Sequence, residues 1–176
     1  MPQVAATEAI ERLSQVVADF PQPGVSFRDL TPVFANGPAL RLVIDALVEP
    51  YAGHFDAVAG VEARGFVLAA AAAYATDLGV VMIRKPGKLP RRVLSEDYDL
   101  EYGSTTLQLH PDELPPGSRV LLLDDVLATG GTLAASCSLI EEAGWSVAGI
   151  SVALEISALG GLSRLPGRDV HSLLVL

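Results

Sequence analysis

The apolar and polar positions of the chain follow two different periods, which predicts a mixed α/β fold. Apolar residues recur at helical spacing in four stretches, so we expect helices at residues 4–18, 36–50, 65–78 and 132–143. Short apolar runs predict strands at residues 56–61, 80–83, 104–110, 120–123, 147–154 and 171–176. Residues 85–103 are mostly polar and fit neither period, so we expect an irregular loop there.

The order of these elements indicates how they pack. Residues 56–83 and 120–154 each read strand, helix, strand, which predicts parallel strands joined by right-handed crossovers. We therefore expect an α/β fold with a central, mostly parallel twisted sheet flanked by helices, and residues 104–110 at an edge or in a hairpin. No repeat or linker interrupts the 176 residues, so residues 1–176 are expected to form a single domain.

Composition narrows the classes of partner. Half of the residues are apolar and only 19% are charged, which suggests apolar surface buried between the subunits of a homodimer. The net charge of -9 argues against nucleic-acid partners. The longest apolar run, residues 66–75, is shorter than the roughly 20 residues of a membrane-spanning helix. Residues 1–13 show no signal-peptide pattern, so we expect a cytoplasmic protein without a membrane partner.

The most informative segment is residues 120–132, VLLLDDVLATGGT, where two acids and a glycine turn lie between an apolar run and a helix. Open α/β sheets bind ligands at this position, outside the carboxyl end of a strand. Glycines allow close backbone approach, and a helix N-terminus attracts phosphate. Asp124 and Asp125 would repel phosphate but suit the hydroxyls of a sugar. The segment therefore indicates a ribose 5-phosphate site, and an ordinary buried strand and turn is the structural alternative.

Three other segments could complete such a site. Arg64 lies beside a glycine at a predicted helix start, where it would hold a phosphate or only cap a turn. Residues 84–90, RKPGKLP, place three cations in an acidic protein, which indicates a local anion site or a solvated loop. Phe27, beside Arg28, could stack on a planar ring or simply anchor the N-terminal segment.

Residues 120–132 resemble the 5-phosphoribosyl-1-pyrophosphate (PRPP) motif of the type I phosphoribosyltransferases. Upstream, the segments PQPGVSFRD, GVEARGF, IRKPGKLP and YDLEYG occur in an order similar to that of the adenine-specific members of this family. The resemblance extends from about residue 20 to about residue 165. It implies the type I phosphoribosyltransferase fold, with an N-terminal base-binding segment at residues 1–35 and a flexible lid loop at residues 85–103. It also implies a cis peptide bond between Glu62 and Ala63.

The resemblance further implies a purine-salvage reaction in which adenine and PRPP give AMP and pyrophosphate. Mg²⁺ would be the cofactor, held mainly through PRPP, pyrophosphate and water, with no direct protein ligand. The catalytic residues would be Glu101, Asp124 and Asp125. The implied binding residues are, for PRPP and its 5-phosphate, Asp124, Asp125, Ala128, Thr129, Gly130, Gly131 and Thr132; for pyrophosphate, Glu62, Ala63, Arg64, Arg84, Lys85 and Lys88; and for adenine, Ser26, Phe27, Arg28 and Val126.

Two other functions remain open at this point. Another purine phosphoribosyltransferase, acting on hypoxanthine, guanine or xanthine, would share the PRPP motif. A non-catalytic regulator of the same fold that senses PRPP would share it too. Such regulators usually carry an added nucleic-acid-binding surface, and the sequence shows no basic patch of that kind.

Overall fold

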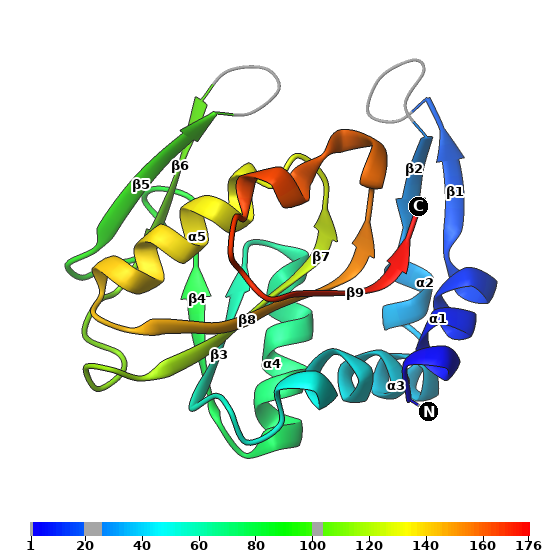
Figure 1. The fold of residues 1–176 in the computed structure, drawn as a ribbon, viewed down its shortest axis with the longest axis horizontal. Coiled ribbons are helices and arrows are strands. Elements are labelled where there is room, and N and C mark those ends of the chain that lie inside the picture. The colour runs from blue at the N-terminus through cyan, green and yellow to red at the C-terminus, as the bar shows by residue number, and fades with distance from the viewer. Residues whose placement is uncertain (1, 20–25, 100–103) are drawn as a thin grey trace.

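The computed structural model describes residues 2–19, 26–99 and 104–176. Within these residues, five parallel strands form the central sheet in the order β4-β3-β7-β8-β9 (Figure 1). Their bounds are Gly79–Ile83, Ala57–Val61, Arg119–Leu127, Ser146–Glu155 and Val170–Val175 in that order. The parallel sheet and the edge strand at the C-terminal end confirm the fold predicted from the sequence.

Helices cover both faces of this sheet. On one face lie α1 (Pro2–Leu13), α2 (Thr31–Phe34), α3 (Gly37–Val48) and α4 (Arg64–Thr76). On the other lies α5 (Gly131–Glu142) together with a hairpin of β5 (Leu94–Asp99) and β6 (Ser104–Leu109) (Figure 1). Short 3₁₀ turns lie after α3 at η1 (Glu49–Tyr51) and after β8 at η2 (Ser157–Leu159) and η3 (Gly161–Arg164).

Strand β7 shows why an unbroken apolar run predicts a central strand. Successive side chains point to opposite faces, so Leu121 and Leu123 pack against the α3 and α4 layer, while Val120 and Leu122 pack against α5. All four are fully buried. Burying one such side chain stabilises a fold by roughly 1.5–3 kcal/mol. A polar residue at any of the four would lose that contribution.

Three predicted boundaries were wrong. The helix predicted at residues 4–18 ends at Leu13, and Gln15–Ala18 form β1, which pairs antiparallel with β2 (Ser26–Asp29). The motif strand continues to Leu127, so both acids lie within β7 rather than after it, because β8 offers ladder partners as far as Glu155. The helix predicted at residues 65–78 ends at Thr76, with Asp77 left-handed at a φ of 57°, and Gly79 begins β4.

The prediction of an irregular loop over the whole of residues 85–103 was also wrong. Leu94–Asp99 form β5, with Leu94 opposite Leu109 and Tyr98 opposite Thr105 on β6. Leu94 and Tyr98 pack against the core cluster under α5. The period-two pattern of this strand is weak in the sequence because only Leu94 and Tyr98 of its six residues are apolar or aromatic. Residues 100–103 lie outside the described residues.

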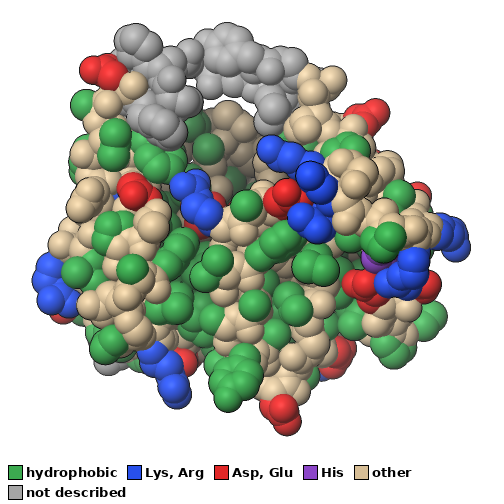
Figure 2. All heavy atoms as spheres, turned by 180° about the vertical axis from the view of Figure 1, so that it is seen from behind, with side chains coloured by type: hydrophobic (Ala, Val, Ile, Leu, Met, Phe, Trp, Pro, Cys, Tyr) green, Lys and Arg blue, Asp and Glu red, His purple; other side chains and the backbone are tan. Residues whose placement is uncertain are grey.

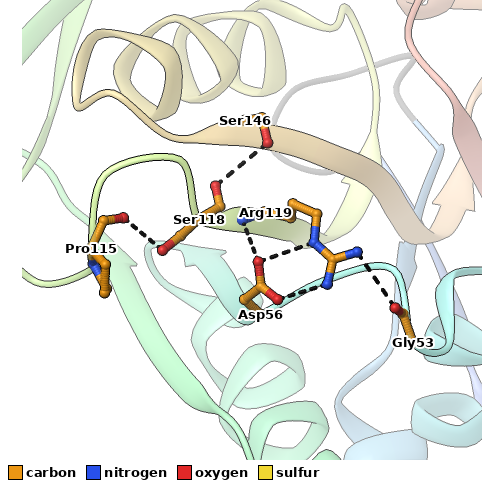
Figure 3. Close-up of polar contacts among 6 residues, drawn as sticks. All are labelled: Gly53, Asp56, Pro115, Ser118, Arg119 and Ser146. Atoms are coloured by element: carbon orange, nitrogen blue, oxygen red, sulfur yellow. Dashed lines mark hydrogen bonds and ion pairs between the residues drawn. The ribbon is translucent and has the colours of Figure 1, made fainter.

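At the amino ends of the parallel strands, a polar network joins β3 to β7 (Figure 3). Asp56 accepts from the backbone N–H of Arg119 at 2.9 Å and from its guanidinium Nη2 at 2.7 Å. Ser118 in turn accepts at its carbonyl from the backbone N–H of Ser146, the first residue of β8, at 2.9 Å. These bonds fix the relative starts of three neighbouring strands. No helix in the described residues is long and apolar enough to cross a membrane.

The Asp56 network predicts a pH-dependent loss of stability. Hydrogen bonds from Arg119 lower the pKa of Asp56 from 3.8 to about 2. The bonded carboxylate therefore stabilises the fold above about pH 4, and this contribution is lost as the pH falls through 2. In urea unfolding, we expect Asp56→Asn to be less stable than the wild type at pH 7, and the gap should narrow as the pH approaches 2. A gap that stays constant with pH would contradict this account.

Candidate active site

The carboxyl ends of β3 and β7 open into a cavity of about 310 Å³. It brings together residues from segments far apart in the sequence, and most of them were predicted from it. The predicted residues that line it are Glu62, Ala63, Arg64, Lys85, Asp124, Asp125 and Thr132. The β5–β6 hairpin adds Tyr98, Thr105 and Leu107. Tyr98 begins the YDLEYG segment of the predicted lid loop, but none of the three was predicted as a binding or catalytic residue. This cavity is referred to below as the acidic pocket.

Two buried carboxylates form the floor of the acidic pocket. Asp124 is 9% exposed and Asp125 is 7% exposed, and the backbone N–H of Asp125 donates to Asp124 Oδ1 at 2.8 Å. Burial raises the pKa of Asp124, and the charge of Asp125 raises it further. Burial also raises the pKa of Asp125, although the cation of Arg64 acts in the opposite direction. Two neighbouring buried acids whose pKa values are raised are typical of functional sites rather than of stable cores.

Arg64, the first residue of α4, connects the acids to an aromatic ring on another segment. Its Nε lies 2.6 Å from Asp125 Oδ2, and its guanidinium carbon lies 5.2 Å from the centroid of the Phe27 ring. Asp125 Oδ2 is buried and has no aligned hydrogen bond, so the contact is an ion pair. Arg64 is thus placed between the residues predicted for adenine and those predicted for ribose.

The peptide bond between Glu62 and Ala63 is cis, as expected. Glu62 is turned toward the basic segment, where its Oε2 accepts from Arg84 Nε at 3.2 Å and from the backbone N–H of Lys85 at 3.1 Å. Burial acts to raise the pKa of Glu62, but these hydrogen bonds outweigh it and hold the pKa below its usual value. Glu62 therefore orients the basic segment as an anion.

The cations of the basic segment differ in their placement. Lys85 lines the acidic pocket, whereas Arg84 lies with its guanidinium carbon 5.6 Å from the centroid of the Phe66 ring. Lys88 is exposed and is not among the residues that line the acidic pocket. Only Lys85 of these three cations therefore reaches the pocket of its own chain.

Beside the acids, the turn before α5 encloses a small hollow of about 60 Å³. Of the five residues predicted there for the 5-phosphate, Ala128, Thr129, Gly130 and Thr132 line the hollow and Gly131 begins α5. Gly130 adopts a left-handed conformation, with a φ of 81°, that favours glycine. The hollow lies at the N-terminus of a helix of 12 residues, where free N–H groups and the helix dipole favour an anion.

The structure also supports this turn with a glycine that the sequence analysis missed. A Cβ built on Gly161, in η3, would lie 2.3 Å from the carbonyl oxygen of Ala128 and 3.1 Å from the backbone nitrogen of Gly130. The 3₁₀ turn therefore packs backbone against backbone on the predicted phosphate turn. Its one sequence signal is the pair Gly160-Gly161, which follows strand β8.

A third cavity, of about 290 Å³ and mainly apolar, adjoins the acids on the side of β2. Its lining includes the predicted adenine residues Phe27, Arg28 and Val126. It also includes residues that were not predicted, namely Val16, Leu154, Ile156 and Leu176. Leu154 and Ile156 could have been found, since they lie at and just after the end of β8, the strand that follows the motif helix. This cavity is referred to below as the apolar pocket.

Two predicted residues remain without a described side chain. Ser26 begins β2, but only its backbone is described. Glu101, the predicted acid or base, lies outside the described residues. Their roles therefore stay predictions.

Comparison with known proteins identifies the family of this chain. The model of the phosphoribosyl transferase domain family matches residues 35–163. An adenine phosphoribosyltransferase of Renibacterium salmoninarum is 63% identical over 98% of this chain and 94% of its own length. One from Clavibacter michiganensis is 61% identical over the full length of both chains.

Solved structures give the same result. The crystal structure of adenine phosphoribosyltransferase from Thermoanaerobacter pseudethanolicus matches with a TM-score of 0.92 and 42% identity, over 97% of this chain and 99% of that one. The Saccharomyces cerevisiae enzyme, complexed with adenine and an imino-altritol bisphosphate, matches with a TM-score of 0.92 and 32% identity over the same shares. This chain therefore belongs to the phosphoribosyltransferase family and, within it, to the adenine phosphoribosyltransferases.

Proposed function

We propose that this protein transfers the 5-phosphoribosyl group of PRPP to adenine, releasing AMP and pyrophosphate. One observation carries the proposal: the apolar pocket, the buried acids and the phosphate turn adjoin one another. Val126 lines both the apolar pocket and the phosphate hollow, and it follows directly after Asp125. A flat base, a ribose and a 5-phosphate therefore have neighbouring places in the order in which AMP joins them.

In this reaction the bond between the anomeric carbon and the pyrophosphate oxygen breaks, and a bond from adenine N9 to that carbon forms. The sugar gains positive charge as pyrophosphate leaves, so its stabilisation and positioning are the main tasks of the protein. Asp124 and Asp125 hold the ribose hydroxyls and stabilise that charge. Arg64 and Lys85 attract the leaving pyrophosphate, and Phe27 and Val126 enclose adenine. Adenine loses a ring N–H proton as the bond from N9 forms, and Glu101 takes that proton; in the reverse reaction Glu101 gives it back.

The site also fits Mg²⁺ as the cofactor. The ion commonly binds one or two carboxylates together with substrate phosphates and water. Asp124 and Asp125 offer carboxylates at the pocket. Within the described residues, no group of three or more His, Cys, Asp or Glu side chains could hold a metal ion. When bound, Mg²⁺ neutralises charge on the leaving pyrophosphate.

Turnover of labelled PRPP with a panel of bases tests this function. We expect AMP from adenine at a kcat/KM at least about 100-fold above that for hypoxanthine, guanine or xanthine, because a site that pairs with a base edge rejects bases with other donors. Preference for one of the other purines would instead indicate a different purine phosphoribosyltransferase. PRPP binding without turnover of any base would indicate a regulator.

We further propose that the protein acts as a homodimer in the cytoplasm, with no nucleic-acid or membrane partner. Hydrophobic side chains spread over the face on which α4 lies (Figure 2). Tyr74 on this helix is 92% exposed, and Val67, Val80 and Met82 of α4 and β4 are exposed with it. Such a patch is typical of an interface between proteins. Lys88, which does not line the acidic pocket of its own chain, would then reach the pocket of the other subunit, as the family resemblance implies.

Mixing two inactive variants tests this arrangement. Lys88→Ala lacks the basic side chain and Asp124→Asn lacks the acid, so a heterodimer retains one site with both. We expect the mixture, after subunit exchange, to recover activity that neither variant has alone. A monomeric mass for fully active wild type in equilibrium sedimentation would refute the dimer.

A further inference from the structure

The phenol of Tyr98 lies at the junction of the acidic pocket and the phosphate turn. Tyr98 belongs to β5, which packs against α5, and its ring is partly buried against the core cluster under that helix. Its hydroxyl lies 3.2 Å from Thr132 Oγ1, and both side chains line the acidic pocket. Thr132 also lines the phosphate hollow. The β5–β6 hairpin therefore places the Tyr98 hydroxyl against Thr132, the residue that lines both the acidic pocket and the phosphate hollow.

The phenol of Tyr98 can donate a hydrogen bond to a bound ligand. In its contact with Thr132 either hydroxyl can be the donor, because each carries one O–H and acceptor lone pairs. When Thr132 donates to the Tyr98 oxygen, the phenol proton is left for an acceptor in the pocket. The group beside it in the occupied site would be a phosphate oxygen, which carries charge and accepts strongly.

The surroundings of Tyr98 favour an anionic acceptor. Lys85 and Arg64 line the same pocket and attract anions, while the carboxylates lie on its floor. Thr105, directly opposite Tyr98 on β6, lines the pocket as a second hydroxyl from the hairpin. A tyrosine present only for packing would need its ring but not a hydroxyl at this boundary.

We propose that Tyr98 donates a hydrogen bond to a phosphate oxygen of PRPP and so makes the β5–β6 hairpin part of the substrate site. The inference rests on the proposed function, and it deepens that function by adding a substrate-binding residue from the hairpin. The donor could meet the 5-phosphate or the pyrophosphate, which share this chemistry. Binding of ribose 5-phosphate and of pyrophosphate, measured separately, distinguishes the two.

The variant Tyr98→Phe tests the proposal, because it removes the hydroxyl and keeps the ring. We expect the KM for PRPP to rise by about 10-fold or more, as for the loss of a hydrogen bond to a charged group. The KM for adenine should stay within about twofold of the wild-type value. By calorimetry with Mg²⁺, either ribose 5-phosphate or pyrophosphate should bind more weakly, which identifies the phosphate.

Tyr51→Phe is the matched control. It removes the hydroxyl of a buried tyrosine that donates to the carbonyl of Ile150 at 3.2 Å. Tyr51 does not line the acidic pocket, so the variant should lower stability without changing the KM for PRPP. Equal KM values for PRPP in Tyr98→Phe and wild type would overturn the proposal, as would equal losses for PRPP and adenine. Absence of turnover in the wild type would overturn the proposed function instead, while the binding measurements would still test Tyr98.

Discussion

Replacing Asp125 by Asn should reduce kcat/KM for PRPP by about 100-fold or more, as for the loss of a preorganised group that stabilises transition-state charge. Asn keeps the size of the side chain but removes the negative charge that faces the developing cation of the sugar. It also removes the ion-pair partner of Arg64, whose Nε lies 2.6 Å from the carboxylate. Asp124→Asn should show a loss of similar size, because the two acids occupy one pocket.

The loss of activity in these variants should not be accompanied by a similar loss of folding stability. Burial raises the pKa of Asp124 above its ordinary value of 3.8, so the folded state holds the proton more tightly than the unfolded chain does. This contribution is fully present below pH 3.8 and is lost as the pH rises through the folded-state pKa. At pH 7 the buried carboxylate is therefore unfavourable for folding. Asp124→Asn should be at least as stable as wild type there.

Steady-state kinetics and urea unfolding of the same samples measure both effects. Asp56→Asn is the matched control, since it makes the same chemical change at the opposite ends of the strands. It should lose stability and retain kcat/KM, which is the reverse of the pattern at Asp124. If activity and stability fell together in Asp124→Asn and Asp125→Asn, the acids would have a structural role.

The residues that the sequence located best are those whose role depends on local backbone. Residues 120–132 combine a buried strand, two acids and a turn before a helix, and each step follows from its neighbours in the chain. The turn and the acids therefore lie where the sequence placed them, even though β7 runs through the acids. The cis bond at Glu62 was likewise expected, but from family resemblance rather than from the residues themselves.

The residues that the sequence missed depend on contacts between distant segments. Val16 lines the apolar pocket only because β1 pairs with β2, whereas the helical spacing of Leu13 and Val17 suggested one continuous helix. Tyr98 lines the acidic pocket only because β5 pairs with β6, and the strand is short of apolar residues. Antiparallel pairing supplies backbone hydrogen bonds that overrode these local preferences. Such pairings are not visible in the spacing of one segment.

Glu62 shows a related limit. The family resemblance implied that Glu62 binds pyrophosphate, and Glu62 does line the acidic pocket. The structure adds its hydrogen bonds to Arg84 and to the backbone of Lys85, which lie more than 20 residues away in the chain. Glu62 thus affects the site by orienting the basic segment, in addition to lining the pocket itself. Only the fold reveals that partner.

Gly161→Ala is the second variant with a large expected effect, because Gly161 packs against the phosphate turn, which is distant in the sequence. A methyl group there would lie 2.3 Å from the Ala128 carbonyl oxygen and 2.7 Å from Leu127 Cδ1. Since the first contact is with backbone, no side-chain rotation relieves it, and the turn at residues 128–130 must move. We expect the KM for PRPP to rise by about 100-fold, because even about 1 Å of displacement in a positioning element has effects of that order.

Gly37→Ala is the control, since a Cβ at Gly37 meets nothing within 4 Å. It should leave the KM values for PRPP and adenine unchanged. Gly161→Ala should also lose stability, by about 1–3 kcal/mol, as for overpacking elsewhere. The decisive measurement is therefore ribose 5-phosphate binding to the folded variant at a temperature well below its unfolding transition. Wild-type affinity there would show that the turn tolerates the methyl group and that η3 does not position the phosphate site.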